Sequence, residues 1–175
     1  QRSGPRIHVP KAVNGPWASR YRIQDNTGLA RALNAGDARQ RSAMCLMAHG
    51  GFRPEVLADG SNGLRLPALR DAHLTPEVLV FDRVPCRVDV PEELSKTEEE
   101  YFTFLGAEAC EYVQADVKAR LLAGETITPD SPVLASGNRN KPFLDSASLS
   151  QVIRKAMRRA GIPEPPYIWR SYFSN

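Results

Sequence analysis

The sequence predicts an α+β fold that is mainly α-helical, with one small three-stranded antiparallel sheet set among the helices. Two observations predict this fold class. Apolar residues recur at helical spacing in several long segments, and three short segments of alternating polarity lie together near the middle of the chain. The length of 175 residues and the hydrophobic content of 42% are enough for one ordinary core.

Three helices are predicted toward the N-terminal end. The first two lie within residues 25–51, where the Gly50–Gly51 pair supplies a stop for the second. Asp37 stands where a cap is needed, because a short polar side chain accepts the unpaired backbone N–H groups of a first helical turn. A third helix is expected to restart at Pro54, since proline suits a first turn. This start places Arg53 at the helix entrance.

The sheet and the remaining helices follow. Three short strands of one sheet are expected at residues 77–84, 86–91 and 101–106. These segments are rich in valine or aromatic residues, which favour strands. The polar loop EELSKTEEE, which carries Lys96, joins the second strand to the third. Further helices are expected at residues 107–124 and 145–161 and from Tyr167 onward.

Charge is distributed unevenly along the chain. The net charge is only +3, but residues 1–22 carry a local +5, residues 138–175 carry another +5, and residues 92–130 carry −7. Two basic ends around an acidic middle fit a molecule that turns one face toward a polyanion. Solvated faces of mixed sign are the alternative for any single cluster.

Composition excludes several classes of protein. The cysteines Cys45, Cys86 and Cys110 are odd in number and far apart, which argues against a zinc site or a disulfide framework and fits a reducing compartment. No apolar run approaches the roughly 20 residues that a membrane span needs. The chain starts without methionine and without a signal-peptide pattern, so we expect a piece of a longer protein.

Familiar enzyme motifs are missing or incomplete. The stretch AHGGF is superficially similar to the oxyanion-hole segment of some esterases, but the G-x-S-x-G turn of those enzymes is absent. The chain also lacks the glycine patterns of mononucleotide- and dinucleotide-binding loops. A serine hydrolase and a nucleotide-binding enzyme are therefore unfavoured.

Arg53 has two possible roles at its helix entrance. It could form a salt bridge with Glu55 or Asp59, which is the more common role for such a residue. It could instead share an anion with backbone N–H groups of the helix start. The sequence around Arg53 alone leaves both open.

Lys96 and Arg170 are also ambiguous when taken singly. Lys96 could be a solvated loop lysine among glutamates. Arg170 lies three residues after Tyr167, on the same helical face, and could pack against aromatic neighbours such as Trp169 or Tyr172.

Taken together and in order, these residues match a family pattern. The segments LMAHGGFRPEVL, ELSKTEEEYFTFLGAEACEYV and PPYIWRSYF resemble the catalytic domain of tyrosine recombinases, the phage-integrase family. They look most like integrases of archaeal plasmids and viruses, which are mobile genetic elements. The resemblance runs from about Arg20 to the end of the chain and implies the helical fold of that domain with its small sheet.

The resemblance implies a reaction and its residues. Such enzymes integrate or recombine DNA at specific sites, by cleaving and rejoining strands through a 3′-phosphotyrosine intermediate. Arg53 and Arg170 would clamp the non-bridging phosphate oxygens with directional, charge-assisted hydrogen bonds. Lys96 would donate a proton to the departing 5′ oxygen. Tyr167 stands where the family usually has histidine, and its phenol would bind and position the phosphate. Neither metal nor cofactor is implied.

The nucleophile is expected to lie outside this chain. The family places a His or Trp and then the nucleophilic tyrosine several turns beyond the last arginine. Tyr172 is only two residues past Arg170 and would point from another face of the helix, while Tyr101 and Tyr112 lie in strand and core-helix contexts. Because the nucleophile would lie beyond the last arginine, we expect residues 23–175 to be a partial catalytic domain. Residues 1–22 are expected to be an extended arm or linker.

Double-stranded DNA is the expected partner. Arg154, Lys155 and Arg158 lie opposite the apolar stripe of their helix, where they can neutralise phosphates, and Arg39 and Arg41 could add contacts. The resemblance implies self-association on DNA, no membrane or metal partner, and a cytoplasmic, nucleoid-associated location. Two alternatives stay open: a non-catalytic DNA-binding module that retains the recombinase fold, and a helical protein-interaction domain.

Overall fold

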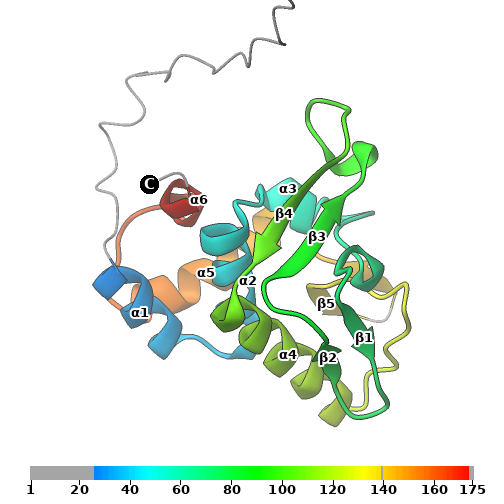
Figure 1. The fold of residues 1–175 in the computed structure, drawn as a ribbon. Helices are drawn as coiled ribbons and strands as arrows, with labels where there is room; N and C mark the ends of the chain where they lie inside the picture. The colour runs from blue at the N-terminus through cyan, green and yellow to red at the C-terminus, as the bar shows by residue number, and fades with distance from the viewer. Residues whose placement is uncertain (1–25, 139, 174–175) are drawn as a thin grey trace, which may run out of the picture.

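The fold consists of six α-helices, two short 3₁₀ helices and six strands within the residues that the computed structural model describes, 26–138 and 140–173 (Figure 1). The helices are α1 (Asn26–Ala35), α2 (Ala38–Gly50), α3 (Pro54–Leu57), α4 (Ala107–Leu122), α5 (Ser146–Arg159) and α6 (Ile168–Phe173). The strands are β1 (Ala72–Leu74), β2 (Leu79–Phe81), β3 (Cys86–Val90), β4 (Tyr101–Leu105), β5 (Ala135–Asn138) and β6 (Lys141–Phe143). The predicted arm, residues 1–22, lies outside the described residues.

The ends of the helices follow the predicted local signals. Asp37 caps α2 in a capping box, in which the Gln40 backbone N–H donates to the Asp37 carboxylate (2.8 Å) and the Asp37 N–H donates to the Gln40 side chain (3.0 Å). Gly51 ends α2 in the left-handed conformation (φ 67°), which favours glycine. Asp145 also caps α5, and its carboxylate accepts the Ser148 backbone N–H (2.7 Å). The last helix, α6, begins one residue later than predicted, at Ile168.

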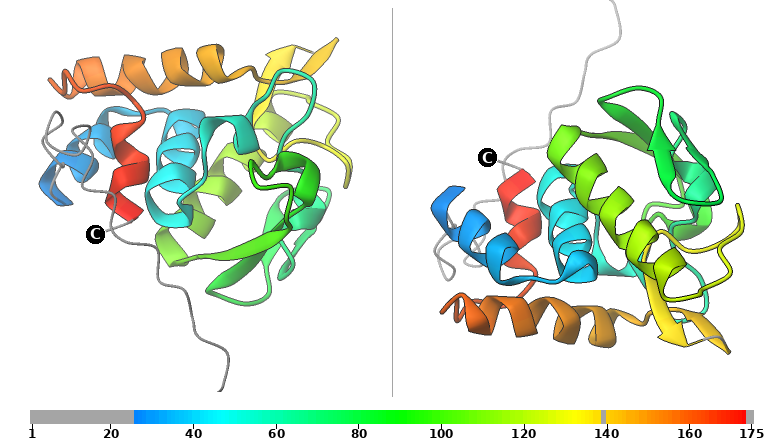
Figure 2. Two further views of the ribbon diagram at one scale, coloured as in Figure 1. Left: turned by 90° about the horizontal axis from the view of Figure 1, so that it is seen from above. Right: turned by 90° about the horizontal axis from the view of Figure 1, so that it is seen from below.

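Helix α2 lies at the centre of the molecule and packs against α1, α4, α5 and α6 (Figure 2). Nine of its residues are buried, among them Met44, Leu46 and Met47, which are fully buried. Because neighbours surround it, its buried residues do not lie along a single stripe, as expected for a helix inside a core. Phe52 and Trp169, both fully buried, extend this core toward α3 and α6. The segments that carry Arg53 and Arg170 are therefore attached to one rigid centre.

The predicted three-stranded sheet is wrong in its pairing. The strands pair in three separate antiparallel pairs, β1–β2, β3–β4 and β5–β6. Strand β2 pairs with β1, with His73 opposite Val80, and not with β3. The segment before β2 supplies the 3₁₀ helix Leu66–Ala68 and the partner strand β1. A single bridge between Leu69 and Val88 connects this region to β3.

The β3–β4 hairpin projects from the body of the molecule. Its connection, residues 91–100, contains the 3₁₀ helix Glu92–Leu94 and extends beyond the strands at the same end of the molecule as α3 (Figure 1). Five residue pairs align the two strands, from Cys86 with Leu105 to Val90 with Tyr101.

Among the helices in the described part of the chain, none is long and apolar enough to cross a membrane.

Candidate functional site

The turn between α2 and α3 fixes the position of Arg53. Gly51 reverses the chain, Phe52 is fully buried, and Arg53 is the extended N-cap residue of α3, directly before Pro54. This sequence of a left-handed glycine, a core aromatic residue and a helix-starting proline holds the Arg53 backbone between two anchored neighbours. The half-buried side chain is presented at the helix entrance, as predicted.

Arg53 has no carboxylate partner within residues 26–138 and 140–173. Neither Glu55 nor Asp59 forms the salt bridge that was the alternative role for this arginine. The Asp59 carboxylate instead accepts the backbone N–H groups of Ser61 (2.9 Å) and Asn62 (2.5 Å), and these hydrogen bonds lower its pKa. The Arg53 guanidinium thus keeps its hydrogen-bond donors for another anion.

One pocket brings together three of the four predicted catalytic residues. Arg53, Lys96 and Tyr167 line a cavity of about 490 Å³ between α3, the 91–100 connection and the start of α6. The other lining residues are Glu55, Val56, Asp59, Glu93, Leu94 and Ser95. Lys96 is exposed and belongs to the projecting connection, whereas Arg53 belongs to the body of the molecule. Segments distant in sequence therefore converge on one cavity.

Arg170, the fourth predicted residue, is joined to this cavity through Tyr167. Its Nη1 donates to the Tyr167 hydroxyl (2.6 Å), and its Nε donates to the Gly51 carbonyl (3.0 Å). Tyr167 and Arg170 also line an adjoining pocket of about 150 Å³, so Tyr167 borders both cavities. Because Gly51 lies two residues before Arg53, both arginines are held to the same turn.

The hydrogen bond between Arg170 and Tyr167 has a defined direction. A guanidinium only donates, so the Tyr167 oxygen accepts and its own O–H remains to donate to a third group. Tyr167 is 48% exposed, while Pro166, Ile168 and Trp169 beside it are buried. Its buried neighbours anchor this residue at the surface, with a hydroxyl oriented by Arg170.

Arg53 and Arg170 both influence the pKa of the Tyr101 hydroxyl. Burial raises the pKa of the Tyr101 hydroxyl, and both Arg53 and Arg170 act to lower it. Both guanidinium groups therefore act on the same hydroxyl. From the sequence, Tyr101 was considered only as a nucleophile. Its position directly after the Lys96 loop is the sequence feature that could have indicated a role in the site.

The five residues predicted to bind DNA lie outside both pockets. Arg154, Lys155 and Arg158 are exposed on α5, which α2 separates from the β3–β4 pair (Figure 2). Arg39 and Arg41 are half-buried and make contacts inside the protein. Arg39 donates to the Ser136 carbonyl (3.1 Å), and Arg41 donates to the Leu33 carbonyl (2.8 Å). Their DNA contacts stay a prediction.

Comparison with known proteins supports the fold. No protein-family model and no curated protein matches the sequence. Among solved structures, the crystal structure of XerA recombinase is similar, with a TM-score of 0.61 and 16% sequence identity. The chain has a recombinase-like fold. The match covers 88% of this chain and 48% of XerA recombinase, so the chain spans about half the length of that protein.

Proposed function

We propose that this chain is the DNA-binding catalytic part of a site-specific tyrosine recombinase. The observation that carries the proposal is the convergence of Arg53, Lys96, Tyr167 and Arg170 on two adjoining pockets that share Tyr167. These residues come from three segments of the chain, and they follow the ordered pattern of the family, with Tyr167 at the position of its usual histidine. The recombinase-like fold supports the same assignment.

The two arginines would bind the phosphodiester. Neither forms an ion pair with a carboxylate in the described part of the chain, so neither has to break an ion pair to bind an anion. Each guanidinium presents a planar set of donors that can hold two phosphate oxygens at once. The extra negative charge that develops on the non-bridging oxygens during strand cleavage strengthens these bonds, and this lowers the barrier.

Lys96 and Tyr167 would complete the site. In the reaction, a tyrosine oxygen attacks phosphorus, the bond to the 5′ oxygen breaks, and the departing oxygen takes a proton from Lys96. Tyr167, oriented by Arg170, donates its O–H to a phosphate oxygen. No tyrosine of the described residues is assigned as the nucleophile. Tyr101 and Tyr112 line neither pocket, Tyr167 is hydrogen-bonded to Arg170, and Tyr172 stacks on His49.

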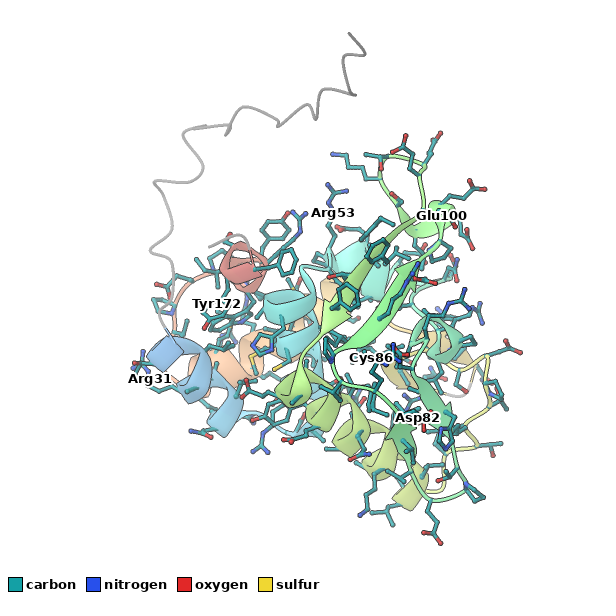
Figure 3. All side chains as sticks on the ribbon, in the orientation of Figure 1. Arg31, Arg53, Asp82, Cys86, Glu100 and Tyr172 are labelled. Carbon is teal, nitrogen blue, oxygen red and sulfur yellow. The ribbon has the colours of Figure 1, made fainter. Side chains whose placement is uncertain are left out.

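DNA binding by the chain tests this proposal. A fluorescent 30-base-pair duplex is titrated with protein, and anisotropy gives the affinity at several salt concentrations. Binding should weaken steeply with salt, and Arg53→Ala and Arg170→Ala should each lower the affinity by about tenfold or more. Arg83→Ala is the matched control, because Arg83 is exposed and directly follows Asp82, which lies well apart from Arg53 (Figure 3). Loss of affinity in the control alone, or no binding at all, would refute the assignment.

The second candidate is a DNA-binding module without covalent chemistry. The observation in its favour is Tyr167, since a phenol is a weaker acid–base group at neutral pH than the histidine usual at this position. A protein that contains this chain together with the nucleophilic tyrosine that the resemblance implies, mixed with a nicked duplex, separates the two candidates. A covalent protein–DNA adduct that disappears in Arg170→Ala supports the recombinase, and unmodified DNA bound with full affinity supports the module.

A further inference from the structure

Strand β4 presents two different faces along its length. Phe102 and Phe104 lie on the outer face and are 54% and 48% exposed, whereas Thr103 and Leu105 are buried on the inner face. Successive side chains of a strand point to opposite sides, so Tyr101 shares the inner face with Thr103 and Leu105. Tyr101 is 40% exposed, as expected for the residue at the rim of that face.

The inner face of β4 packs against the turn that holds both arginines. A Cβ placed on Gly50 would lie 3.2 Å from Leu105 Cδ2, so the Gly50–Gly51 segment is in close contact with the far end of the strand. Arg170 is hydrogen-bonded to the Gly51 carbonyl, and Arg53 follows two residues later. From Leu105, the inner face runs through Thr103 to Tyr101, which directly follows the Lys96 connection.

The electrostatics of the Tyr101 hydroxyl agree with this placement. Both Arg53 and Arg170 act on its pKa, while burial raises that pKa above the usual value of a phenol. The hydroxyl therefore keeps its proton at neutral pH, and it is a hydrogen-bond donor that carries no charge. A phosphate bound by the two guanidinium groups could then also accept a hydrogen bond from this hydroxyl.

We propose that the Tyr101 hydroxyl donates a hydrogen bond to the DNA phosphate held by Arg53 and Arg170. The inference rests on the proposed function and adds a residue to the site. Tyr101 and Tyr167 then contribute uncharged, directional donors, and the arginines contribute charge. Such an arrangement fixes the orientation of the phosphate as well as its position, because each donor selects one oxygen.

Tyr101→Phe is the test, since it removes the hydroxyl and keeps the ring. Affinity for the 30-base-pair duplex should fall about three- to tenfold, as expected for one hydrogen bond. The dependence of affinity on salt should keep its slope, because a neutral donor releases no counterion, whereas Arg53→Ala should lower the slope by about one. Tyr112→Phe, which removes a hydroxyl from a half-buried tyrosine on α4, is the matched control and should bind like wild type.

Two further variants separate a phosphate contact from a structural effect. Tyr101→His keeps an N–H donor and should bind within about twofold of wild type at pH 8, so the loss in Tyr101→Phe is not caused by packing. In an Arg170→Ala background the effect of Tyr101→Phe should shrink below about twofold, because both residues hold one phosphate. Thermal unfolding of each variant confirms that it is folded.

The possible outcomes are distinguishable. If wild type binds and the arginine variants lose affinity, but Tyr101→Phe binds like wild type, the Tyr101 contact is overturned and the proposed function stands. A changed salt slope in Tyr101→Phe also overturns it, since that result indicates an altered charge arrangement. If wild type shows no salt-dependent DNA binding, the proposed function itself fails.

Discussion

Two regions of this molecule hold paired arginines, and the two pairs are used differently. At the corner formed by α2, α3 and α6, Arg53 and Arg170 have no carboxylate partner among the described residues. In the cavity of about 780 Å³ between α2, α4 and the β5–β6 hairpin, Arg39 and Arg120 donate to backbone carbonyl groups, and Arg120 also forms an ion pair with Glu125.

The difference separates a binding role from a folding role. An arginine whose donors are satisfied inside the protein stabilises the fold and has little left for a ligand. Arg53 keeps unfilled donors, and Arg170 keeps donors beyond its hydrogen bonds to Gly51 and Tyr167. Such arginines are ready to bind an anion without breaking an ion pair. Substitutions should therefore affect stability in one region and DNA affinity in the other.

Arg120→Ala should give the largest change in stability. The Arg120 side chain is 10% exposed and bonds to Glu125 (2.8 and 3.1 Å) and to the carbonyls of Pro132 and Val133. Its removal leaves these acceptors unpaired and should lower the free energy of unfolding by about 3 to 5 kcal/mol. Urea denaturation measures this loss, and a variant as stable as wild type would contradict the folding role.

Asp116→Asn should stabilise the same region, in a pH-dependent way. Burial raises the pKa of Asp116 from 3.8 to about 6, with smaller opposing effects of Arg120 and Arg39, and its Oδ2 has no hydrogen-bond partner within the described residues. The folded state therefore binds the proton more tightly than the unfolded chain. Stability is lost as pH rises from 3.8 to about 6, and the full cost of the ionised carboxylate is present above about 6. Asparagine removes that cost.

The expected gain of Asp116→Asn is up to about 3 kcal/mol at pH 7.5. It should shrink as pH falls from about 6 toward 4, where the aspartate is protonated in the folded and then in the unfolded state. Denaturation curves at several pH values provide the measurement. A difference between variant and wild type that is constant over this range would contradict the buried, ionisable Asp116.

Arg53→Lys sharpens the contrast at the other region. It keeps the positive charge but loses the planar fork, so DNA affinity should fall roughly tenfold, while the salt slope stays close to that of wild type. The free energy of unfolding should change by less than about 1 kcal/mol, because the Arg53 side chain forms no ion pair with another described residue. Equal affinity of the lysine variant in anisotropy titrations would argue against a two-oxygen clamp.

Lys96→Ala should have the smallest effect on affinity. Lys96 is exposed in the projecting 91–100 connection, so its contact with a phosphate orders a flexible side chain and gains little net energy. Affinity should fall about threefold and the salt slope by about one. In cleavage assays on a protein that contains this chain and the expected nucleophile, however, Lys96→Ala should reduce strand cleavage strongly, since the departing oxygen lacks its proton donor. Full cleavage activity of Lys96→Ala would show that Lys96 is not the proton donor.

The local features of the fold could be predicted from the sequence, and the long-range pairings could not. The Asp37 cap, the Gly51 stop and the Pro54 helix start depend on neighbouring residues, and all three were predicted. The partner of β2 depends on which of two nearby segments lies beside it in the folded chain, and alternation of polarity does not distinguish them. The three-stranded sheet was therefore wrong although its strands exist.

The same limit applies to the arginines. The carbonyl that engages Arg39 belongs to Ser136, 97 residues away, and the carbonyl that engages Arg170 belongs to Gly51, 119 residues away. A basic residue near a helix start looks the same whether or not such a carbonyl is in reach. The order of Arg53, Lys96, Tyr167 and Arg170 could be read only as a resemblance, and the fold places them around adjoining pockets.

The salt dependence of DNA binding by the Arg53→Ala/Arg170→Ala double variant tests the central claim most directly. If both guanidinium groups bind one DNA phosphate region, the slope of log affinity against log salt should decrease in magnitude by about two relative to wild type. The single variant Arg53→Ala should change the free energy of unfolding little. A double variant that binds duplex with the slope and affinity of wild type would show that DNA does not bind at this corner.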